Sequence, residues 1–172
     1  MEAVEKRGIT AREAAVKMLL AVCRDKQFSH AVKADYLNKL EEKRERALAA
    51  RLFEGSLERL IELDYIINRF SKTPVNKMKP LIRALMRMSV YQILYMDSIP
   101  DSAVCNEAVK LAAAHKFTSL KGFVNGVLRN IARNKDAISY PKKEEDLKKH
   151  LSVACSLPEW LVEHFLKEYD SS

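Results

Sequence analysis

The sequence predicts an all-α protein, because its apolar residues recur with helical spacing and residues that break helices are scarce. Only four of the 172 residues are glycine and five are proline, whereas 48% are hydrophobic. Apolar residues that recur every three or four positions lie on one face of a helix and mark the side that it buries. The most regular such stripe comprises Leu120, Phe123, Val124, Val127, Leu128 and Ile131.

The first helix is predicted to begin at Thr10, after a mixed-charge arm over residues 1–9 that we expect to be mobile. Glu13 follows Thr10 at the capping-box spacing, in which each of the two side chains satisfies a free backbone N–H of the first turn. The helix is expected to extend to about Arg24. Its inner face is predicted to comprise Ala14, Ala15, Met18, Leu19 and Val22.

Two further helices are predicted before residue 71. Ser29 is expected to cap a short one, whose apolar residues are Ala31, Tyr36, Leu37 and Leu40. A long one is expected over residues 43–70, with a buried side of Leu48, Leu52, Gly55, Leu60, Ile61, Ile67 and Phe70. A glycine inside a helix costs about 1 kcal/mol relative to alanine, so we interpret Gly55 as permitting a close helix crossing or a bend. The mixed charges over residues 33–64 are interpreted as solvated i,i+4 pairs and not as a binding site.

A basic connector over residues 71–80 leads into the most apolar helix of the chain, which is predicted over residues 79–96 and placed centrally in the fold. Pro80 is tolerated near the start of this helix because its missing N–H is not needed there. Arg83 and Arg87 lie one turn apart on the helix, and we interpret both side chains as extending to solvent.

Two helices joined by a short basic turn are predicted next. Asp101 or Ser102 is expected to cap the first of them, and Thr118 or Ser119 the second. Residues 108–135 contain six Lys or Arg residues and no acid. The second helix therefore combines an apolar stripe with a basic outer face.

Gly122 and Gly126 lie one turn apart on the second of these helices, a spacing that indicates close packing of a neighbouring helix or close approach of a ligand.

After that helix, the sequence becomes more polar and more charged. The run NKDAISYPKKEEDLKKH is interpreted as a polar linker with a helical turn or two. A short amphipathic helix is then predicted to begin at Pro158, with Trp160 and Phe165 among its apolar residues.

Composition and motifs narrow the class of function. The net charge of +7 suits a polyanionic partner, with nucleic acid first and an anionic membrane surface second. The apolar runs are too short to span a bilayer, and the N-terminal residues MEAVEKRGIT lack the apolar core of a signal peptide, so we expect a cytoplasmic protein without a membrane partner. Three widely separated cysteines disfavour a disulfide framework or a zinc site. Because no phosphate-binding glycine loop or nucleophile–base pair occurs, we expect no catalytic site and no cofactor or metal in this chain.

The basic turn before the last predicted helix of the domain is the best candidate for a nucleic-acid interface. Phosphates bind Lys and Arg side chains, backbone N–H groups and helix N-termini, and this turn offers all of them. Phe123 can stack on an unpaired base, although it also fits the core stripe. The first helix supplies a second basic strip. The candidate RNA-binding residues are Arg7, Arg12, Lys17, Lys116, Ser119, Lys121, Gly122 and Phe123.

Three segments of the chain resemble the NusB domain, namely TAREAAVKMLLAV, MKPLIRALMRMSVYQILYMDSIPDSAVCNEAVKLA and GFVNGVLRNIAR. The resemblance implies a NusB-like fold of two roughly perpendicular three-helix bundles, followed by a linker and a short helix. It also implies RNA contacts near the N-terminus and at the opening of the NGVL helix. Those contacts correspond to Arg7, Arg12, Lys17, Ser119, Lys121 and Phe123. We therefore place a NusB-like RNA-binding domain over residues 10–134.

The C-terminal segment LSVACSLPEWLVEHF is similar to the one that joins the NusB-like domain to the catalytic part of the RsmB/Sun family. That family comprises rRNA cytosine 5-methyltransferases that use S-adenosylmethionine, with catalytic cysteines in a Rossmann-like domain. The similarity implies that residues 135–172 are a linker and the start of the methyltransferase part. It implies small-subunit rRNA and the enzyme's own catalytic domain as partners, with S-adenosylmethionine as the cofactor of the parent enzyme.

Three functions stay open at this point. The first is an rRNA-docking module of a 5-methylcytosine methyltransferase. The second is a stand-alone NusB-type transcription antitermination factor that binds RNA together with a ribosomal protein. The third is a protein-interaction module, in which the basic faces bind an acidic partner or the catalytic domain.

Overall fold

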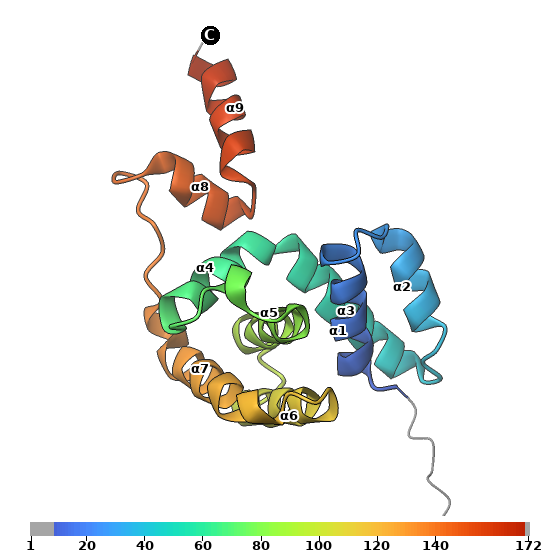
Figure 1. The fold of residues 1–172 in the computed structure, drawn as a ribbon. Helices are drawn as coiled ribbons and strands as arrows, with labels where there is room; N and C mark the ends of the chain where they lie inside the picture. Colours follow the sequence, from blue (N-terminus) through green and yellow to red (C-terminus); the bar gives the residue numbers. More distant parts are fainter. Residues whose placement is uncertain (1–8, 171–172) are drawn as a thin grey trace, which may run out of the picture. The chain divides into compact units, whose positions relative to one another are not determined.

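The computed structural model describes residues 9–170, which belong to two compact units divided between Gly55 and Ser56. Every regular element within residues 9–170 is a helix, as the sequence predicts (Figure 1). The first unit contains α1 (Ala11–Cys23), α2 (Ser29–Leu37) and most of α3 (Lys43–Glu58). The second contains α4 (Leu60–Phe70), α5 (Pro80–Tyr95), α6 (Asp101–Ala114), α7 (Lys121–Asn134), α8 (Leu147–Cys155) and α9 (Glu159–Asp170), with the 3₁₀ turns η1 (Val75–Lys77), η2 (Thr118–Leu120) and η3 (Lys135–Ala137).

The Thr10 half of the predicted capping box of α1 forms. The Thr10 hydroxyl accepts a hydrogen bond from the backbone N–H of Glu13 at 3.2 Å. The Glu45 carboxylate, from α3, accepts a second hydrogen bond from the backbone N–H of Ala11 at 2.9 Å. Two free N–H groups of the first turn are thus satisfied, and the starts of α1 and α3 are held together. The predicted arm over residues 1–9 lies outside the described residues, apart from Ile9.

Helix α2 differs from the prediction in its cap and its inner side. It begins at Ser29, but the capping position is Phe28, which makes no side-chain cap hydrogen bond. Val32 is its buried residue, whereas Ala31 is exposed. Of the other predicted apolar residues, Leu40 is buried just after the helix, and Tyr36 and Leu37 are half-buried.

The single long helix predicted over residues 43–70 is wrong, because the chain leaves helical geometry at Arg59. The backbone there has φ −108° and ψ 21°, and α4 starts afresh at Leu60. The break shifts the buried side, so that Leu63, Ile66 and Ile67 lie inside while Leu60 and Ile61 are half-buried. Gly55 lies within α3, upstream of the break, and is buried.

Helix α5 is the central helix of the second unit, as predicted. It is buried almost all round and starts with Pro80 in the first turn. The prediction that Arg87 extends to solvent is wrong, since this residue is only 9% exposed and its guanidinium pairs with Asp64. Arg83 instead turns back on the connector and donates hydrogen bonds to the carbonyls of Val75, Asn76 and Met78 at 2.9, 3.0 and 3.2 Å.

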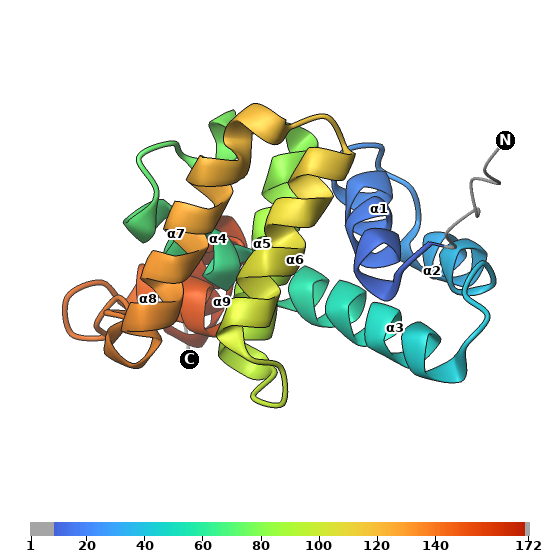
Figure 2. The ribbon, with the colours of Figure 1, turned by 90° about the horizontal axis from the view of Figure 1, so that it is seen from below.

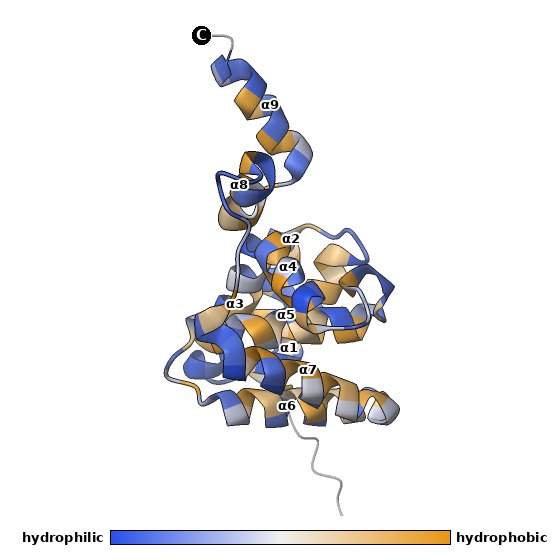
Figure 3. Cartoon of the chain, turned by 90° about the vertical axis from the view of Figure 1, so that its left-hand side faces the viewer, coloured by the Kyte–Doolittle hydropathy of each residue, from blue (hydrophilic) through white to orange (hydrophobic). Residues whose placement is uncertain are grey.

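The segment after α7 is more structured than the linker and single helix that the sequence predicts. It contains two helices, and α8 is the one that was missed. The Asp146 carboxylate caps α8 by accepting from the backbone N–H of Lys149 at 2.9 Å, and Ser156 ends it in the left-handed conformation with φ 52°. The Ser156 hydroxyl then accepts from the backbone N–H of Ile61 at 3.0 Å, which ties the segment to α4. Helix α9 is amphipathic, with hydrophobic and hydrophilic residues interleaved along it (Figure 3).

Candidate nucleic-acid interface

Helices α6 and α7 lie side by side in the second unit, joined by a tight turn (Figure 2). The backbone N–H of Phe117 donates to the Ala112 carbonyl at 2.8 Å, and that of Lys116 donates to the Ala113 carbonyl at 3.1 Å. These two bonds make a Schellman motif, whose left-handed position is usually glycine. Here Lys116 occupies it, with φ 67°, and its side chain is exposed. The turn therefore presents a cation immediately before α7.

Helix α7 begins without the predicted hydroxyl cap. Thr118 and Ser119 form the 3₁₀ turn η2, and the capping position of α7 is Leu120, which makes no side-chain cap hydrogen bond. The prediction that Thr118 or Ser119 caps this helix is thus wrong, because the 3₁₀ turn shifts the helix start to Lys121. Asp101 or Ser102 likewise does not cap α6, which has Pro100 at that position. Asp101 instead accepts a hydrogen bond from Lys135 at 2.9 Å.

The apolar stripe of α7 packs inward as predicted. Val124, Leu128 and Ile131 are fully buried, and Val127 is nearly so. Leu120 and Phe123 are half-buried. The opposite face of the helix is therefore left for solvent or a ligand.

A groove of about 470 Å³ runs between α6 and α7 on this outer side. It is lined by Asn106, Val109, Lys110, Lys121, Gly122, Asn125 and Arg129. Three of these residues are cations and none is an acid, so the lining is strongly basic. We call this surface the α6/α7 groove.

Two side-chain interactions organise the groove. The Arg129 Nε–H donates to the Asn125 Oδ1 at 2.9 Å, which holds the guanidinium along α7. Lys110 forms an exposed ion pair with Glu107, one turn earlier on α6, at 3.0 Å. Exposed pairs of this kind contribute about 0–1 kcal/mol, so Lys110 can exchange Glu107 for another anion at little cost.

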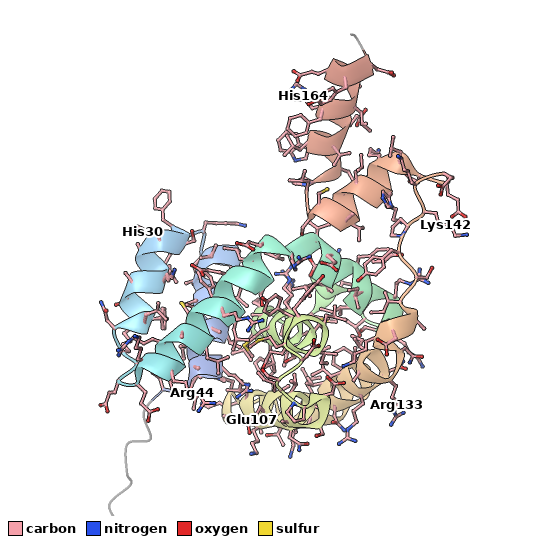
Figure 4. The ribbon with its side chains drawn as sticks, turned by 180° about the vertical axis from the view of Figure 1, so that it is seen from behind. His30, Arg44, Glu107, Arg133, Lys142 and His164 are labelled. Atoms are coloured by element: carbon pink, nitrogen blue, oxygen red, sulfur yellow. The ribbon has the colours of Figure 1, made fainter. Side chains whose placement is uncertain are left out.

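A smaller cavity of about 250 Å³ continues beside the α6/α7 groove and shares Arg129 with it. Its lining includes Cys105 and Arg133, and Figure 4 shows the Arg133 side chain extending outward from α7. Burial raises the pKa of the Cys105 thiol, which disfavours a reactive thiolate there. Within residues 9–170, no group of three His, Cys, Asp or Glu side chains is placed to hold a metal ion.

The two glycines of α7 do not serve close helix packing. A Cβ atom built on Gly122 or Gly126 meets nothing within 4 Å. Of the two interpretations that the spacing allows, packing of a neighbouring helix is therefore wrong. Gly122 instead lines the α6/α7 groove, where the missing side chain leaves room.

The predicted residues of the turn and of α7 gather in one part of the second unit. Lys121 and Gly122 line the α6/α7 groove, and Lys116 and Ser119 are exposed in the turn that precedes it. Phe123 is half-buried on the same helix, so only part of its ring is accessible.

The predicted residues of the first helix belong to the other unit. Arg12 and Lys17 are half-buried on α1, and five positions separate them, which places them about 140° apart around the helix. Lys17 forms an ion pair with Glu13 at 3.2 Å. Arg12 and Lys17 therefore do not form one strip on this helix. Arg7 lies outside the described residues.

Four polar residues of the groove are not among the predicted RNA-binding residues, namely Asn106 and Lys110 on α6, and Asn125 and Arg129 on the polar outer face that the sequence predicts for α7. The sequence does indicate the two residues of α7, because Lys121, Asn125 and Arg129 follow each other at i,i+4 spacing and so share one side of that helix. The contribution of α6 was not visible, since it depends on how that helix packs against α7.

Comparisons with known proteins agree on a family. The sequence model of the NusB family matches residues 9–133. No helix among residues 9–170 has the length and apolar character needed to cross a membrane.

Three relatives illustrate the similarity in sequence. The probable ribosomal RNA small subunit methyltransferase B of Bacillus subtilis is 38% identical over 124 residues, which are 72% of this chain and 27% of that protein. The corresponding protein of Synechocystis is 31% identical over 121 residues, or 70% of this chain and 27% of the relative. The transcription antitermination protein NusB of Dictyoglomus thermophilum is 37% identical over 98 residues, or 56% of this chain and 68% of the relative. The chain thus spans about a quarter of the length of the two methyltransferases.

Solved structures agree with the fold. A NusB structure from T. maritima superposes with a TM-score of 0.66 at 26% identity, covering 72% of this chain and 88% of that one. A crystal structure of the antitermination factors NusB and NusE in complex with dsRNA matches with a TM-score of 0.66 at 20% identity, covering 72% of this chain and 93% of the other. Because the identity to the NusB–NusE structure is only 20%, this similarity supports the fold alone.

Proposed function

Because the chain belongs to the NusB family, we propose that it is the RNA-docking domain of a small-subunit rRNA cytosine 5-methyltransferase. The observation that carries this proposal is the 38% identity over 124 residues to a methyltransferase B relative. In the proposed enzyme, this domain binds rRNA and positions it for a separate methyltransferase part. That part, and not this chain, binds S-adenosylmethionine and performs the methyl transfer in the cytoplasm.

The α6/α7 groove and the turn before it are the proposed contact with the RNA backbone. Lys116, Lys121 and Arg129 supply positive charge, and the first N–H groups of α7 have no side-chain cap. Phosphates bind such combinations of cations and a helix N-terminus, although the Lys121 N–H itself donates to the Thr118 carbonyl. Arg7, Arg12 and Lys17, near the other end of the chain, are proposed as a second set of contacts.

The test is RNA binding by the 172-residue chain and by a charge-reversed variant. We expect binding to single-stranded rRNA segments that weakens steeply between about 50 and 200 mM salt. Arg12→Glu combined with Lys121→Glu should lower the affinity by about tenfold or more without unfolding the chain, as checked by circular dichroism.

The matched control is Lys43→Glu combined with Lys143→Glu, which changes the net charge equally at two other exposed sites. It should retain most of the affinity. An equal loss of RNA affinity in both variants would mean that only the net charge matters. Unchanged affinity in the variant of Arg12 and Lys121 would mean that the interface lies elsewhere. Absence of RNA binding at low salt would overturn the proposal.

A second candidate function is a transcription antitermination factor, which the 37% identity to the NusB protein of Dictyoglomus thermophilum favours. Such a factor binds RNA together with a ribosomal protein, so adding NusE should raise its RNA affinity cooperatively. A methyltransferase domain should show no such rise. The reading frame that follows residue 172 gives an independent distinction, since a methyltransferase sequence there supports the first function and a stop codon the second.

The proposed enzyme also needs this domain to contact its own catalytic part. A pull-down with that part, performed with and without nuclease, separates a direct protein contact from one bridged by RNA. Retention after nuclease treatment supports the direct contact. The domain limits of residues 10–134, with residues 135–172 leading into the methyltransferase part, remain part of the same proposal.

A further inference from the structure

We propose that α9 is a docking helix, which packs into an apolar groove of the methyltransferase part of the proposed enzyme through one stripe of side chains. This stripe, which we call the α9 stripe, comprises Val162, Phe165, Leu166 and Tyr169. The inference rests on the proposed function and names the surface through which the two parts of that enzyme meet.

Exposed aromatic side chains gather on α9. Of the six large hydrophobic residues that are exposed within residues 9–170, Trp160, Phe165 and Tyr169 lie on this helix of 12 residues. Their exposed fractions are 69%, 43% and 79%. Single exposed hydrophobic residues are normal on a protein surface, whereas a cluster of them marks an interaction site. The cluster on α9 therefore indicates a surface that a partner covers.

The α9 stripe has the spacing of a helix that lies in a groove. Its residues follow each other at positions i, i+3, i+4 and i+7, so they share one face. Val162 is buried and Leu166 is half-buried, whereas the two aromatic residues are exposed. The main helical neighbour of α9 is α8, and Figure 1 shows α9 extending away from it. Helices that bind in a hydrophobic groove use anchors at this spacing.

The corner between α8 and α9 holds the stripe in a fixed direction. The backbone N–H of Leu157 donates to the Ser152 carbonyl at 3.0 Å, and the Ser152 hydroxyl donates to the Leu157 carbonyl at 2.5 Å. Ser156, in the same corner, accepts from the backbone N–H of Ile61 on α4. Helix α9 is thus attached through a structured corner and not as a free tail. A surface that is ordered before binding loses less conformational entropy when its partner binds.

The charge of α9 indicates a protein as the partner. The helix carries four acids, Glu159, Glu163, Glu168 and Asp170, and Lys167 is its one Lys or Arg residue. In a chain with a net charge of +7, this helix is therefore acidic, and it repels RNA phosphates and anionic membrane surfaces. An apolar groove with Lys or Arg residues at its rim complements both the stripe and the acids.

The methyltransferase part is favoured as the owner of that groove. The match covers 27% of the methyltransferases of Bacillus subtilis and of Synechocystis, so about three quarters of each lies outside it. In the proposed enzyme, the methyltransferase part follows α9 in the same chain. This covalent connection raises its effective concentration at the α9 stripe, so a small contact suffices.

A second copy of this chain has no such connection. A stable contact between separate proteins buries about 1,200–2,000 Å² in total. An aromatic side chain buries about 150–250 Å². Phe165 and Tyr169 of two copies therefore supply less area than a stable dimer needs.

Hydrogen exchange of the α9 amides tests the proposal. It is measured in the 172-residue chain and in the longer product of the same reading frame, with the buried helix α5 as an internal reference. In the 172-residue chain the α9 amides should exchange rapidly, because most of the helix is exposed. In the longer product they should exchange at least about tenfold more slowly, since opening the helix there also breaks the contact with the groove.

Two matched variants of the longer product identify the stripe as the cause. Phe165→Ser with Tyr169→Ser should abolish the slow exchange of α9, and the helix should persist because Ser, Phe and Tyr have similar helix propensities. Phe28→Ser with Trp160→Ser also removes two exposed aromatic side chains, but both lie outside the stripe. Trp160 lies nearly opposite Val162, since two positions correspond to about 200° around the helix. This second variant should keep the slow exchange, and an equal loss in both variants would overturn the role of the stripe.

The remaining outcomes separate this inference from the proposed function. A longer product that contains the methyltransferase sequence and binds RNA, but whose α9 exchanges as rapidly as in the 172-residue chain, overturns the inference alone. A stop codon after residue 172 overturns the proposed function. Slow exchange that appears in the 172-residue chain and increases with its concentration would overturn the inference in favour of a second copy. Loss of RNA affinity in the 172-residue chain with Phe165→Ser and Tyr169→Ser would overturn it in favour of RNA.

Discussion

Arg87 and Asp64 form a partly buried ion pair that joins α5 to α4 within the second unit. The guanidinium donates two hydrogen bonds to the two carboxylate oxygens, both at 2.7 Å. This bidentate geometry is the strongest form of an Arg–carboxylate contact, and Arg87 is only 9% exposed. The guanidinium therefore depends on one carboxylate for the compensation of its charge.

Asp64→Ala should destabilise the chain, because it leaves that charge buried without its partner. We expect the free energy of unfolding to fall by about 2–4 kcal/mol. This is the lower part of the range for broken buried ion pairs, because the Asp64 side chain is partly exposed. Urea unfolding measures it as a lower midpoint at constant slope. Arg87→Met combined with Asp64→Leu should cost clearly less than Asp64→Ala, and an equal cost would show that packing and not charge governs the site.

The sequence could not reveal this pair. An arginine within an apolar helix extends to solvent unless an acid approaches it, and Asp64 lies 23 positions earlier on another helix. The same reason hid Asn106 and Lys110, whose place in the α6/α7 groove comes from the packing of α6 on α7. Features carried by one helix, such as the cap at Thr10 and the buried stripe of α7, were predictable from local spacing.

The segment between α7 and α8 packs on α4 through a shared carboxylate. Glu62 is 5% exposed and accepts hydrogen bonds from the hydroxyls of Tyr95 and Tyr140 at 2.6 and 3.1 Å. Arg59 donates to the same carboxylate at 3.0 Å and neutralises it. Nearby, the Tyr65 hydroxyl donates to the Ser139 carbonyl at 2.9 Å. These contacts make the segment part of the second unit and not a free linker.

The carboxylate network should make stability sensitive to alkaline pH. Burial, followed by the charge of Glu62 and the hydrogen bond to it, raises the pKa of Tyr140 to about 12 from 10.0. The neutral hydroxyl is therefore favoured by folding, and its contribution is complete below pH 10.0 and lost as the pH rises through about 12. Tyr140→Phe keeps the ring but removes the hydroxyl, so its free energy of unfolding should fall less over this interval than that of the wild type.

Chemical unfolding between pH 9 and 12 measures this difference, with Tyr36→Phe, outside the network, as the control. Burial and Glu62 also raise the pKa of Tyr95, so both chains should retain part of the alkaline loss. If the wild type and Tyr140→Phe lost stability in parallel, the contact between Tyr140 and Glu62 would not contribute to folding.

Element boundaries were predicted well where a helix has its own stop and start residues, as between α5 and α6. The predicted boundaries were wrong where tertiary contacts determine the point at which a helix starts or ends. The break at Arg59 has no glycine or proline to announce it, and Arg59 instead reaches Glu62 and Tyr95. Helix α8 was missed because its charged start resembles a linker, while its buried Ser152 and Val153 become visible only once the segment packs.

At the scale of the whole molecule, the charge is unevenly distributed along the chain. The net charge is +7, yet residues 108–135 carry six cations and no acid. Arg87 is neutralised by Asp64, whereas Arg83 donates to uncharged carbonyls and keeps its net charge. Of the six cations over residues 108–135, three line the α6/α7 groove and Lys116 lies in the turn before α7, whereas Arg133 lines the adjoining cavity and Lys135 pairs with Asp101.

This distribution predicts the salt dependence of RNA binding quantitatively. If Lys110, Lys116, Lys121 and Arg129 each neutralise one phosphate of a single strand, the slope of log K against log salt should be about −3, from about −0.7 for each contact. Lys121→Gln should reduce the steepness by about 0.7, whereas Lys72→Gln, at an exposed site in the connector before α5, should leave it unchanged. RNA affinities of the wild type and of both variants, measured across a series of salt concentrations, give these slopes. A weaker Lys121→Gln variant with an unaltered slope would mean that this lysine shapes the groove without neutralising a phosphate.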